Sequence, residues 1–191
     1  MRRAVFLDRD GVLVEDIHLL THADQLRLLP GVPGGLVRLH EAGFLLVVVS
    51  NQPVVARGLC SEADIIRIHA ALDDRLVAEG GCRIDRCSFC PHHPDANVPE
   101  YRIACDCRKP KPGMLLDAAA ELGIDVSASF MIGDRLTDVA AGVAAGCRTV
   151  WVQTGRHVDP LIQTEVPIES DLKPDHVCAD LPTAVGWILN L

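Results

Sequence analysis

Two aspartates separated by a single residue directly follow the first apolar run of the chain. They are Asp8 and Asp10, and two further aspartates, Asp134 and Asp138, follow a later apolar run with one helical turn between them. Two carboxylates on a tight turn can divide the work of a substitution reaction, because one attacks an electrophile while the other gives and takes protons. A lone aspartate at a strand end more often caps a helix, but the full set favours catalysis. Such oxygen-rich sites recruit Mg²⁺, which offsets the repulsion between carboxylates.

The elements that would position these aspartates alternate along the chain. Short segments rich in Val, Ile, Leu and Phe lack polar alternation, as expected of strands buried on both faces: residues 4–7, 45–49, 130–132 and 149–152. Helical patterns lie between and after them, at residues 33–42, 61–78, 112–122, 136–145 and 182–189. This order predicts an α/β fold, a three-layer Rossmann-like parallel sheet with helices on both faces. Ligands then bind beyond the carboxyl ends of the strands. The loosest segment, residues 159–174, contains three prolines and no clear period.

Composition limits the protein classes that remain. With 191 residues, 49% of them apolar, the chain can form one globular domain over residues 1–191 with a proper core. Eighteen basic and 26 acidic residues give a net charge of −8 without a long basic run, which argues against binding to nucleic acid or to anionic membranes. The longest apolar run, residues 44–49, is far short of the roughly 20 residues of a membrane span. We expect a cytoplasmic protein, and the short charged helices favour a monomer.

Four of the eight cysteines gather between residues 87 and 107, together with two histidines. Sulfur and imidazole ligands in a short span suit Zn²⁺, and four of them close a structural tetrahedral site. Spacing alone permits a four-sulfur site made of Cys87, Cys90, Cys105 and Cys107. Free buried cysteines or a surface disulfide are the alternatives, although no secretion signal supports a disulfide framework. We therefore predict a zinc-binding loop at about residues 87–109.

The aspartates belong to a set of motifs that resembles the haloacid dehalogenase (HAD) superfamily of phosphohydrolases. The matching pieces are Asp8-x-Asp10-Gly11, Ser50 after an apolar strand, Lys109 before a helix, and Gly133-Asp134-x-x-x-Asp138. The resemblance implies that Asp8 is a nucleophile that forms an aspartyl-phosphate, and that Asp10 protonates the leaving alcohol and then activates water. It implies that Ser50 and Lys109 hold the phosphoryl oxygens, with Mg²⁺ between Asp8, the Asp10 carbonyl and Asp134. These roles suit phosphoryl transfer, which depends on positioning and charge neutralisation.

Nearly the whole chain resembles one group of these enzymes, the D-glycero-D-manno-heptose 1,7-bisphosphate phosphatases. The shared pieces are residues 6–11, Asn51-Gln52, Ala56-Arg57-Gly58, residues 105–116 except positions 106 and 111, and Gly133-Asp134. The resemblance implies that the zinc ligands are Cys90, His92, Cys105 and Cys107. It leaves Cys87 as an inward-facing strand residue. Because no block of ~60 or more residues is inserted, we expect no large cap domain and an open site.

The same resemblance implies the substrate, a small sugar bisphosphate that loses its 7-phosphate and keeps the anomeric one, on the way to a nucleotide-activated heptose. The residues expected to grip the sugar or its second phosphate are Asn51, Arg57, Arg108 and Arg135, because arginine offers a planar fork of donors. Pro53-Val54 stand where the family usually has Ser-Gly, and Val12 where it has Thr or Ser. These departures leave the preferred anomer open. The alternatives are a histidinol-phosphate phosphatase or another phosphatase of small phosphate monoesters, and a non-catalytic, zinc-stabilised binding protein.

Overall fold

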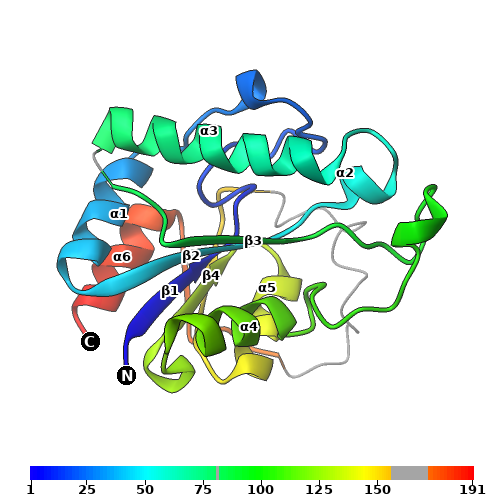
Figure 1. The fold of residues 1–191 in the computed structure, drawn as a ribbon. Coiled ribbons are helices and arrows are strands. Elements are labelled where there is room, and N and C mark those ends of the chain that lie inside the picture. Colours follow the sequence, from blue (N-terminus) through cyan, green and yellow to red (C-terminus); the bar gives the residue numbers. More distant parts are fainter. Residues whose placement is uncertain (81, 156–171) are drawn as a thin grey trace.

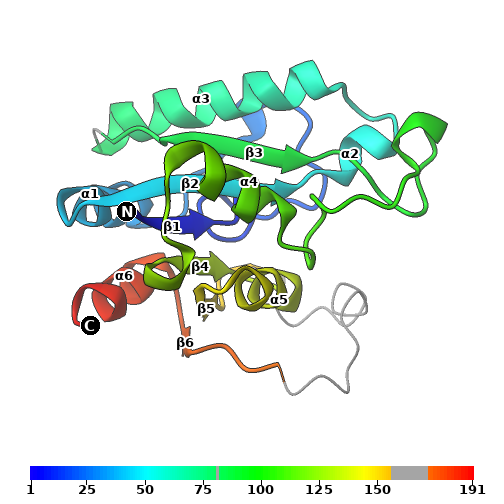
Figure 2. The same cartoon turned by 60° about the horizontal axis from the view of Figure 1, so that its bottom comes forward.

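The computed structural model describes residues 1–80, 82–155 and 172–191. Six parallel strands form one sheet in the order β3-β2-β1-β4-β5-β6, and Figure 2 shows them side by side from β3 at one edge to β6 at the other. Their bounds are β1 (Arg3–Leu7), β2 (Phe44–Asn51), β3 (Arg86–Cys90), β4 (Phe130–Gly133), β5 (Arg148–Val152) and β6 (His176–Cys178). Of the loosest predicted segment, residues 159–171 lie outside the described residues.

The central strand β1 explains why the strand sequences lack polar alternation. It pairs with β2 on one side and with β4 on the other. Val5 and Leu7 enter the hydrophobic cluster on one face of the sheet, and Ala4 and Phe6 enter the cluster on the opposite face. All four side chains are fully buried, so both faces of the strand require apolar residues.

Helices cover both faces of the sheet. Those on one face, α1 (Val32–Glu41), α3 (Glu62–Gly80) and α6 (Leu181–Leu189), contribute to one hydrophobic cluster, whereas α4 (Gly113–Leu122) and α5 (Leu136–Ala145) contribute to the other. Figure 1 shows α3 above the strands and α4 and α5 below them. The predicted three-layer architecture is confirmed. In the described part of the chain there is a single sheet, and no helix is long and apolar enough to cross a bilayer.

Helix ends follow the local sequence signals. Ser61 and Asp64 form a capping box before α3, since the Asp64 N–H donates to Ser61 Oγ (3.2 Å) and the Ser61 N–H donates to Asp64 Oδ2 (2.8 Å). Gly123 and Gly146 end α4 and α5 in the left-handed region, at φ 66° and 89°. The short elements α2 (Pro53–Ala56) and β6 have too few residues to show a period, which is why the sequence did not predict them.

Candidate active site

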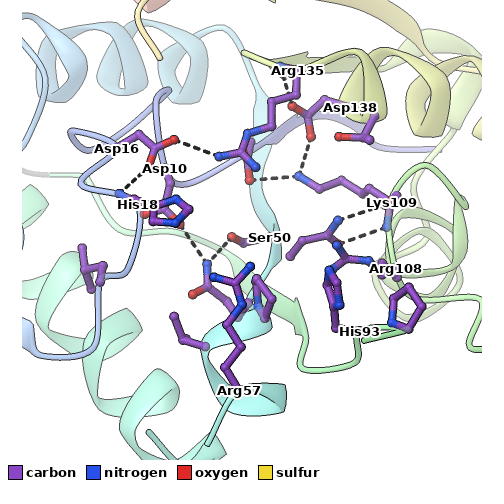
Figure 3. Close-up of a pocket in the computed structure, with 18 of the residues that line it drawn as sticks. Asp10, Asp16, His18, Ser50, Arg57, His93, Arg108, Lys109, Arg135 and Asp138 are labelled. Atoms are coloured by element: carbon purple, nitrogen blue, oxygen red, sulfur yellow. Dashed lines mark hydrogen bonds and ion pairs between the residues drawn. The ribbon is translucent and has the colours of Figure 1, made fainter. Parts of the chain in front are cut away.

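The predicted polar residues meet at the carboxyl edge of the sheet, where strand order switches around β1. Since β2 and β4 flank β1, the segments that follow these three strands converge on one cavity of about 560 Å³. Figure 3 shows this cavity with its lining side chains. Of the residues predicted for catalysis, substrate binding or Mg²⁺, all but Asp134 line it: Asp8, Asp10, Ser50, Asn51, Arg57, Arg108, Lys109 and Arg135.

Three buried carboxylates lie together, and two of them, Asp8 and Asp138, line the cavity. Asp8 follows β1, Asp134 follows β4 and Asp138 lies in the first turn of α5, and one oxygen of each lies within 4.8 Å of the others. The turn after Asp8 approaches so closely that a Cβ on Gly11 would come 2.7 Å from Asp134 Oδ2, and its φ of +81° also favours glycine. Clustered buried carboxylates need cations. A donor set made of carboxylate oxygens fits Mg²⁺.

Lys109 places a positive charge inside this acidic cluster. The side chain is 2% exposed, and its Nζ lies 2.9 Å from Asp8 Oδ1, 2.6 Å from Asp138 Oδ1 and 2.8 Å from the Val49 carbonyl. Burial alone would lower the pKa of Lys109, but Asp138 and Asp8 raise it overall, so the ammonium stays charged.

Two carboxylates of the cluster, Asp8 and Asp134, hold protons more tightly than usual. Burial raises the pKa of Asp8 to about 6 even though Lys109 opposes the shift. Burial, followed by the charges of Asp8 and Asp138, raises the pKa of Asp134 well above its ordinary value. A cation bound here would restore the ionised forms.

Asp10 lies apart from the three clustered carboxylates and has its own partners. Its carboxylate accepts hydrogen bonds from the fully buried Arg9 guanidinium, at 2.8 Å from Nη2 to Oδ2, and from Gln52 Nε2 at 2.9 Å. Burial tends to raise the pKa of Asp10, but the charge and hydrogen bonds of Arg9 lower it overall. The same Gln52 nitrogen donates to Ser50 Oγ at 2.7 Å. Asp10, the acid–base candidate, and Ser50, the phosphoryl-binding candidate, thus both accept hydrogen bonds from the side-chain amide of Gln52.

A basic rim surrounds the acidic floor. Arg57, Arg108 and Arg135 reach the cavity from three sides in Figure 3. Arg135 Nη2 pairs with Asp16 Oδ2 at 2.8 Å, and Arg108 Nη1 donates to the His92 carbonyl at 3.2 Å. Both cations are therefore held in place by protein groups before any substrate arrives.

Asn51 lines the cavity, but both atoms of its amide engage the backbone of Lys109. Its Nδ2 donates to the Lys109 carbonyl at 2.9 Å, and the Lys109 N–H donates to its Oδ1 at 3.0 Å. In this arrangement Asn51 fixes the segment that carries Lys109 between the two carboxylates. The sequence predicted a contact between Asn51 and the substrate and gave no sign of this backbone contact.

The four expected sulfur and nitrogen ligands gather in a second cluster. The three pairwise Sγ distances among Cys90, Cys105 and Cys107 are 3.6, 3.1 and 3.3 Å, and His92 Nδ1 lies 3.6 Å from Cys90 Sγ and 3.4 Å from Cys107 Sγ. A tetrahedral zinc ion with Zn–S bonds of about 2.3 Å requires sulfur–sulfur distances of about 3.8 Å and nitrogen–sulfur distances of about 3.5 Å. These groups fit a zinc ion with little movement. Cys87 packs into the core on the α3 face of the sheet, outside this cluster.

The sulfur cluster is connected to the cavity through the backbone. The Gln52 N–H donates to the carbonyl of Cys90 at 2.8 Å, and Arg108 donates to the carbonyl of His92. The backbone carbonyls of Cys90 and His92, two candidate zinc ligands, therefore hold Gln52 and Arg108, which line the cavity. This connection supports the view that the loop positions the rim of the site.

Several residues of the site were not among the predicted site residues. Asp138 stands in the motif shared with the HAD superfamily but was given no role of its own, and its position one helical turn after Asp134 brings it to the cavity. Arg9 and Gln52 lie next to predicted residues, but sequence spacing does not show that their side chains point inward. Asp16 and His18 line the cavity from the segment after β1, and no pattern in the sequence marks them.

Comparison with known proteins decides the family. A D-glycero-beta-D-manno-heptose-1,7-bisphosphate 7-phosphatase from Photorhabdus laumondii is 43% identical over 186 residues, which cover 97% of this chain and 96% of that protein. The protein of the same name from Escherichia coli K12 is 41% identical, with 95% of this chain and 93% of that protein covered. The chain belongs to this phosphatase family. It is a phosphoric monoester hydrolase, as the sequence predicted.

Further comparisons agree with this heptose bisphosphate phosphatase family. The model of the HAD-hydrolase-like family matches residues 106–184. A crystal structure of D,D-heptose 1,7-bisphosphate phosphatase from B. bronchiseptica, complexed with magnesium and phosphate, matches with a TM-score of 0.81 and 33% identity over 98% of both chains. The HAD-like fold and the resemblance to the heptose bisphosphate phosphatases are confirmed. The hypothesis of a non-catalytic binding protein is not supported.

Proposed function

We propose that this phosphatase hydrolyses the 7-phosphate of D-glycero-D-manno-heptose 1,7-bisphosphate and leaves the 1-phosphate for nucleotide activation. The observation that carries the proposal is the placement of Asp8, a buried carboxylate held by Lys109, at the floor of a cavity rimmed by three arginines. A floor of this kind suits one phosphoryl group in line with a nucleophile, and the rim suits a second phosphate. The two relatives are named as phosphatases of the β anomer, which we expect this enzyme to prefer.

The reaction proceeds in two displacements. A carboxylate oxygen of Asp8 attacks phosphorus, the bond from phosphorus to the sugar oxygen breaks, and Asp10 gives its proton to the departing alkoxide. The phosphate dianion brings negative charge near Asp10, which favours the protonated form needed for this step. Asp10 then takes a proton from water as the water attacks phosphorus, which releases inorganic phosphate and restores the Asp8 carboxylate.

The remaining groups of the floor stabilise charge and geometry. Lys109 Nζ and the Ser50 hydroxyl donate to the non-bridging phosphoryl oxygens, where negative charge is greatest. Asp8, Asp134 and the Asp10 carbonyl would hold Mg²⁺, with Asp138 close to the same position, and the ion would neutralise phosphoryl charge. Lys109 occupies the cluster between Asp8 and Asp138, so it holds the nucleophile in place.

We further propose that Cys90, His92, Cys105 and Cys107 bind a structural Zn²⁺ ion. The fit of their distances to a tetrahedral site supports this assignment. The substrate contacts proposed for the rim involve Arg57, Arg108 and Arg135. The partner is a small sugar bisphosphate, and a single domain, a monomeric state and a cytoplasmic location remain predictions.

Phosphate release from purified protein in magnesium tests the proposed substrate. Both anomers of the heptose 1,7-bisphosphate and histidinol phosphate are supplied in parallel, with Asp8→Asn as the inactive control. We expect the heptose bisphosphate to give the highest kcat/KM and Asp8→Asn to show no turnover. Preference for histidinol phosphate would assign the enzyme to the alternative phosphatase class. Full turnover by Asp8→Asn would exclude Asp8 as the nucleophile.

A further inference from the structure

Gln52 lies at the centre of a buried polar network to which the proposed mechanism assigns no role. Gln52 is only 2% exposed. Its Nε2 donates to Ser50 Oγ at 2.7 Å and to Asp10 Oδ2 at 2.9 Å, and its Oε1 accepts from Arg9 Nη2 at 2.9 Å. One amide therefore contacts the phosphoryl-binding residue, the acid–base residue and a buried cation.

Chemistry fixes the orientation of this amide. Arg9 has only N–H donors and so requires an acceptor, which Gln52 Oε1 provides. The Asp10 carboxylate requires donors, which Nε2 provides. A flipped amide would place N–H groups against N–H groups and oxygen against oxygen, so Arg9 and Asp10 together select one orientation.

The backbone around Gln52 is also restrained. Its N–H donates to the Cys90 carbonyl at 2.8 Å, which ties the end of β2 to the end of β3. Pro53 follows directly and opens α2, and a residue before proline has few allowed backbone conformations. The departure from the usual Ser-Gly thus makes the attachment of this side chain more rigid.

We propose that Gln52, oriented by Arg9, is a positioning residue that prepares Ser50 and Asp10 together for phosphoryl transfer. Ser50 Oγ accepts a hydrogen bond from Gln52, so its own hydrogen is directed to another acceptor, and a phosphoryl oxygen provides one. The second N–H of the amide holds the Asp10 carboxylate beside the same site. The inference rests on the proposed function, because it assumes the roles given to Ser50 and Asp10.

Two substrates with different leaving groups test this role. p-Nitrophenyl phosphate releases a stabilised phenolate and needs little proton donation, whereas the heptose bisphosphate releases an alkoxide. In Gln52→Leu and Gln52→Glu we expect kcat/KM for the sugar substrate to fall about 100-fold or more, in line with the value of a well-placed general acid. For p-nitrophenyl phosphate we expect a loss at least about tenfold smaller. The exposed Gln153→Glu is the matched control and should retain wild-type values for both substrates.

The outcomes separate positioning from simple packing. Gln52→Glu keeps the size of the side chain and can still accept from Arg9, but it cannot donate to Asp10. Equal losses for the two substrates, or wild-type kcat/KM in Gln52→Glu, would overturn the proposal. In an Asp10→Asn background, Gln52→Leu should cause a much smaller further loss on the sugar substrate, and an undiminished loss would also overturn it. Failure of the wild-type enzyme on the sugar would instead count against the proposed function.

Discussion

Replacing Lys109 by methionine would remove the only side-chain cation that the structure pairs with Asp8 among the described residues. Methionine keeps a flexible stem of similar length but has no charge and no donor. Asp8 and Asp138 would lose ion pairs of 2.9 and 2.6 Å, and both carboxylates would stay buried. The Val49 carbonyl would lose a donor at 2.8 Å. The free energy of unfolding of the metal-free protein should therefore fall.

The expected loss can be converted into a melting temperature. Removing one partner of a buried ion pair typically costs about 3–5 kcal/mol. An unfolding entropy of about 2.1 cal/mol/K per residue gives roughly 0.4 kcal/mol/K for 191 residues. The melting temperature of Lys109→Met should thus lie about 7–12 °C below that of the wild type near pH 8. Near pH 5 the loss should be smaller, because the pKa of Asp8 is raised to about 6 and much of its charge is already neutralised by protons.

Thermal unfolding followed by circular dichroism, in the presence of a magnesium chelator, measures this effect. Lys111→Met is the matched control, since this lysine is 52% exposed and its pairing with Asp106 contributes little. Mg²⁺ should raise the midpoint of Lys109→Met more than that of the wild type, because it neutralises the same carboxylates. An unchanged midpoint in Lys109→Met near pH 8, or equal losses at both pH values, would refute the reasoning.

Three further predictions concern the second cluster, the acidic floor and the rim. Cys107→Ser should lose bound zinc and have a lower melting temperature, whereas Cys87→Ser should keep its zinc. The zinc content is measured by mass spectrometry, and zinc retained in Cys107→Ser would contradict the assignment of the ligands. Because burial raises the pKa of Asp8 from 3.8 to about 6, the native state binds more protons than the unfolded state in this range. Metal-free wild type should therefore lose stability as pH rises from about 4 to about 6, and Asp8→Asn should show a smaller fall in urea titrations, because only the buried Asp134 still contributes to it. In steady-state assays, Arg57→Met should raise KM for the sugar bisphosphate about tenfold or more and leave KM for p-nitrophenyl phosphate unchanged. Equal increases in KM for the two substrates would exclude a contact between Arg57 and the second phosphate.

The positions of the catalytic candidates could be predicted because the fold brings strand ends together. Once residues 4–7 and 130–132 are recognised as parallel strands, Asp8 and Asp134 must lie at the same edge of the sheet. The motif order then indicates that Ser50 and Lys109 join them. In the structure Asp8, Ser50 and Lys109 line one cavity, and a carboxylate oxygen of Asp134 lies within 4.8 Å of one of Asp8.

Side-chain partners could not be predicted in the same way. Arg9 is fully buried beside Asp10, although an arginine on a turn is usually exposed. Asn51 turns its amide to the backbone of Lys109, a residue 58 positions away in sequence. Such contacts depend on which loops meet in three dimensions, and single-sequence spacing carries no information about that. The short strand β6 was missed for a related reason, since its pairing with β5 defines it more than its three residues do.

A covalent phosphate on Asp8 is the most direct test of the account. In Asp10→Asn, p-nitrophenyl phosphate should still phosphorylate the enzyme, because its leaving group needs no acid, but hydrolysis of the intermediate should be slow without the base. Rapid acid quenching and mass spectrometry should then find phosphate on the peptide that contains Asp8. The same adduct should be absent from Asp8→Asn. Steady phosphate release by Asp8→Asn, or an adduct on another residue, would contradict the assignment of Asp8 as the nucleophile.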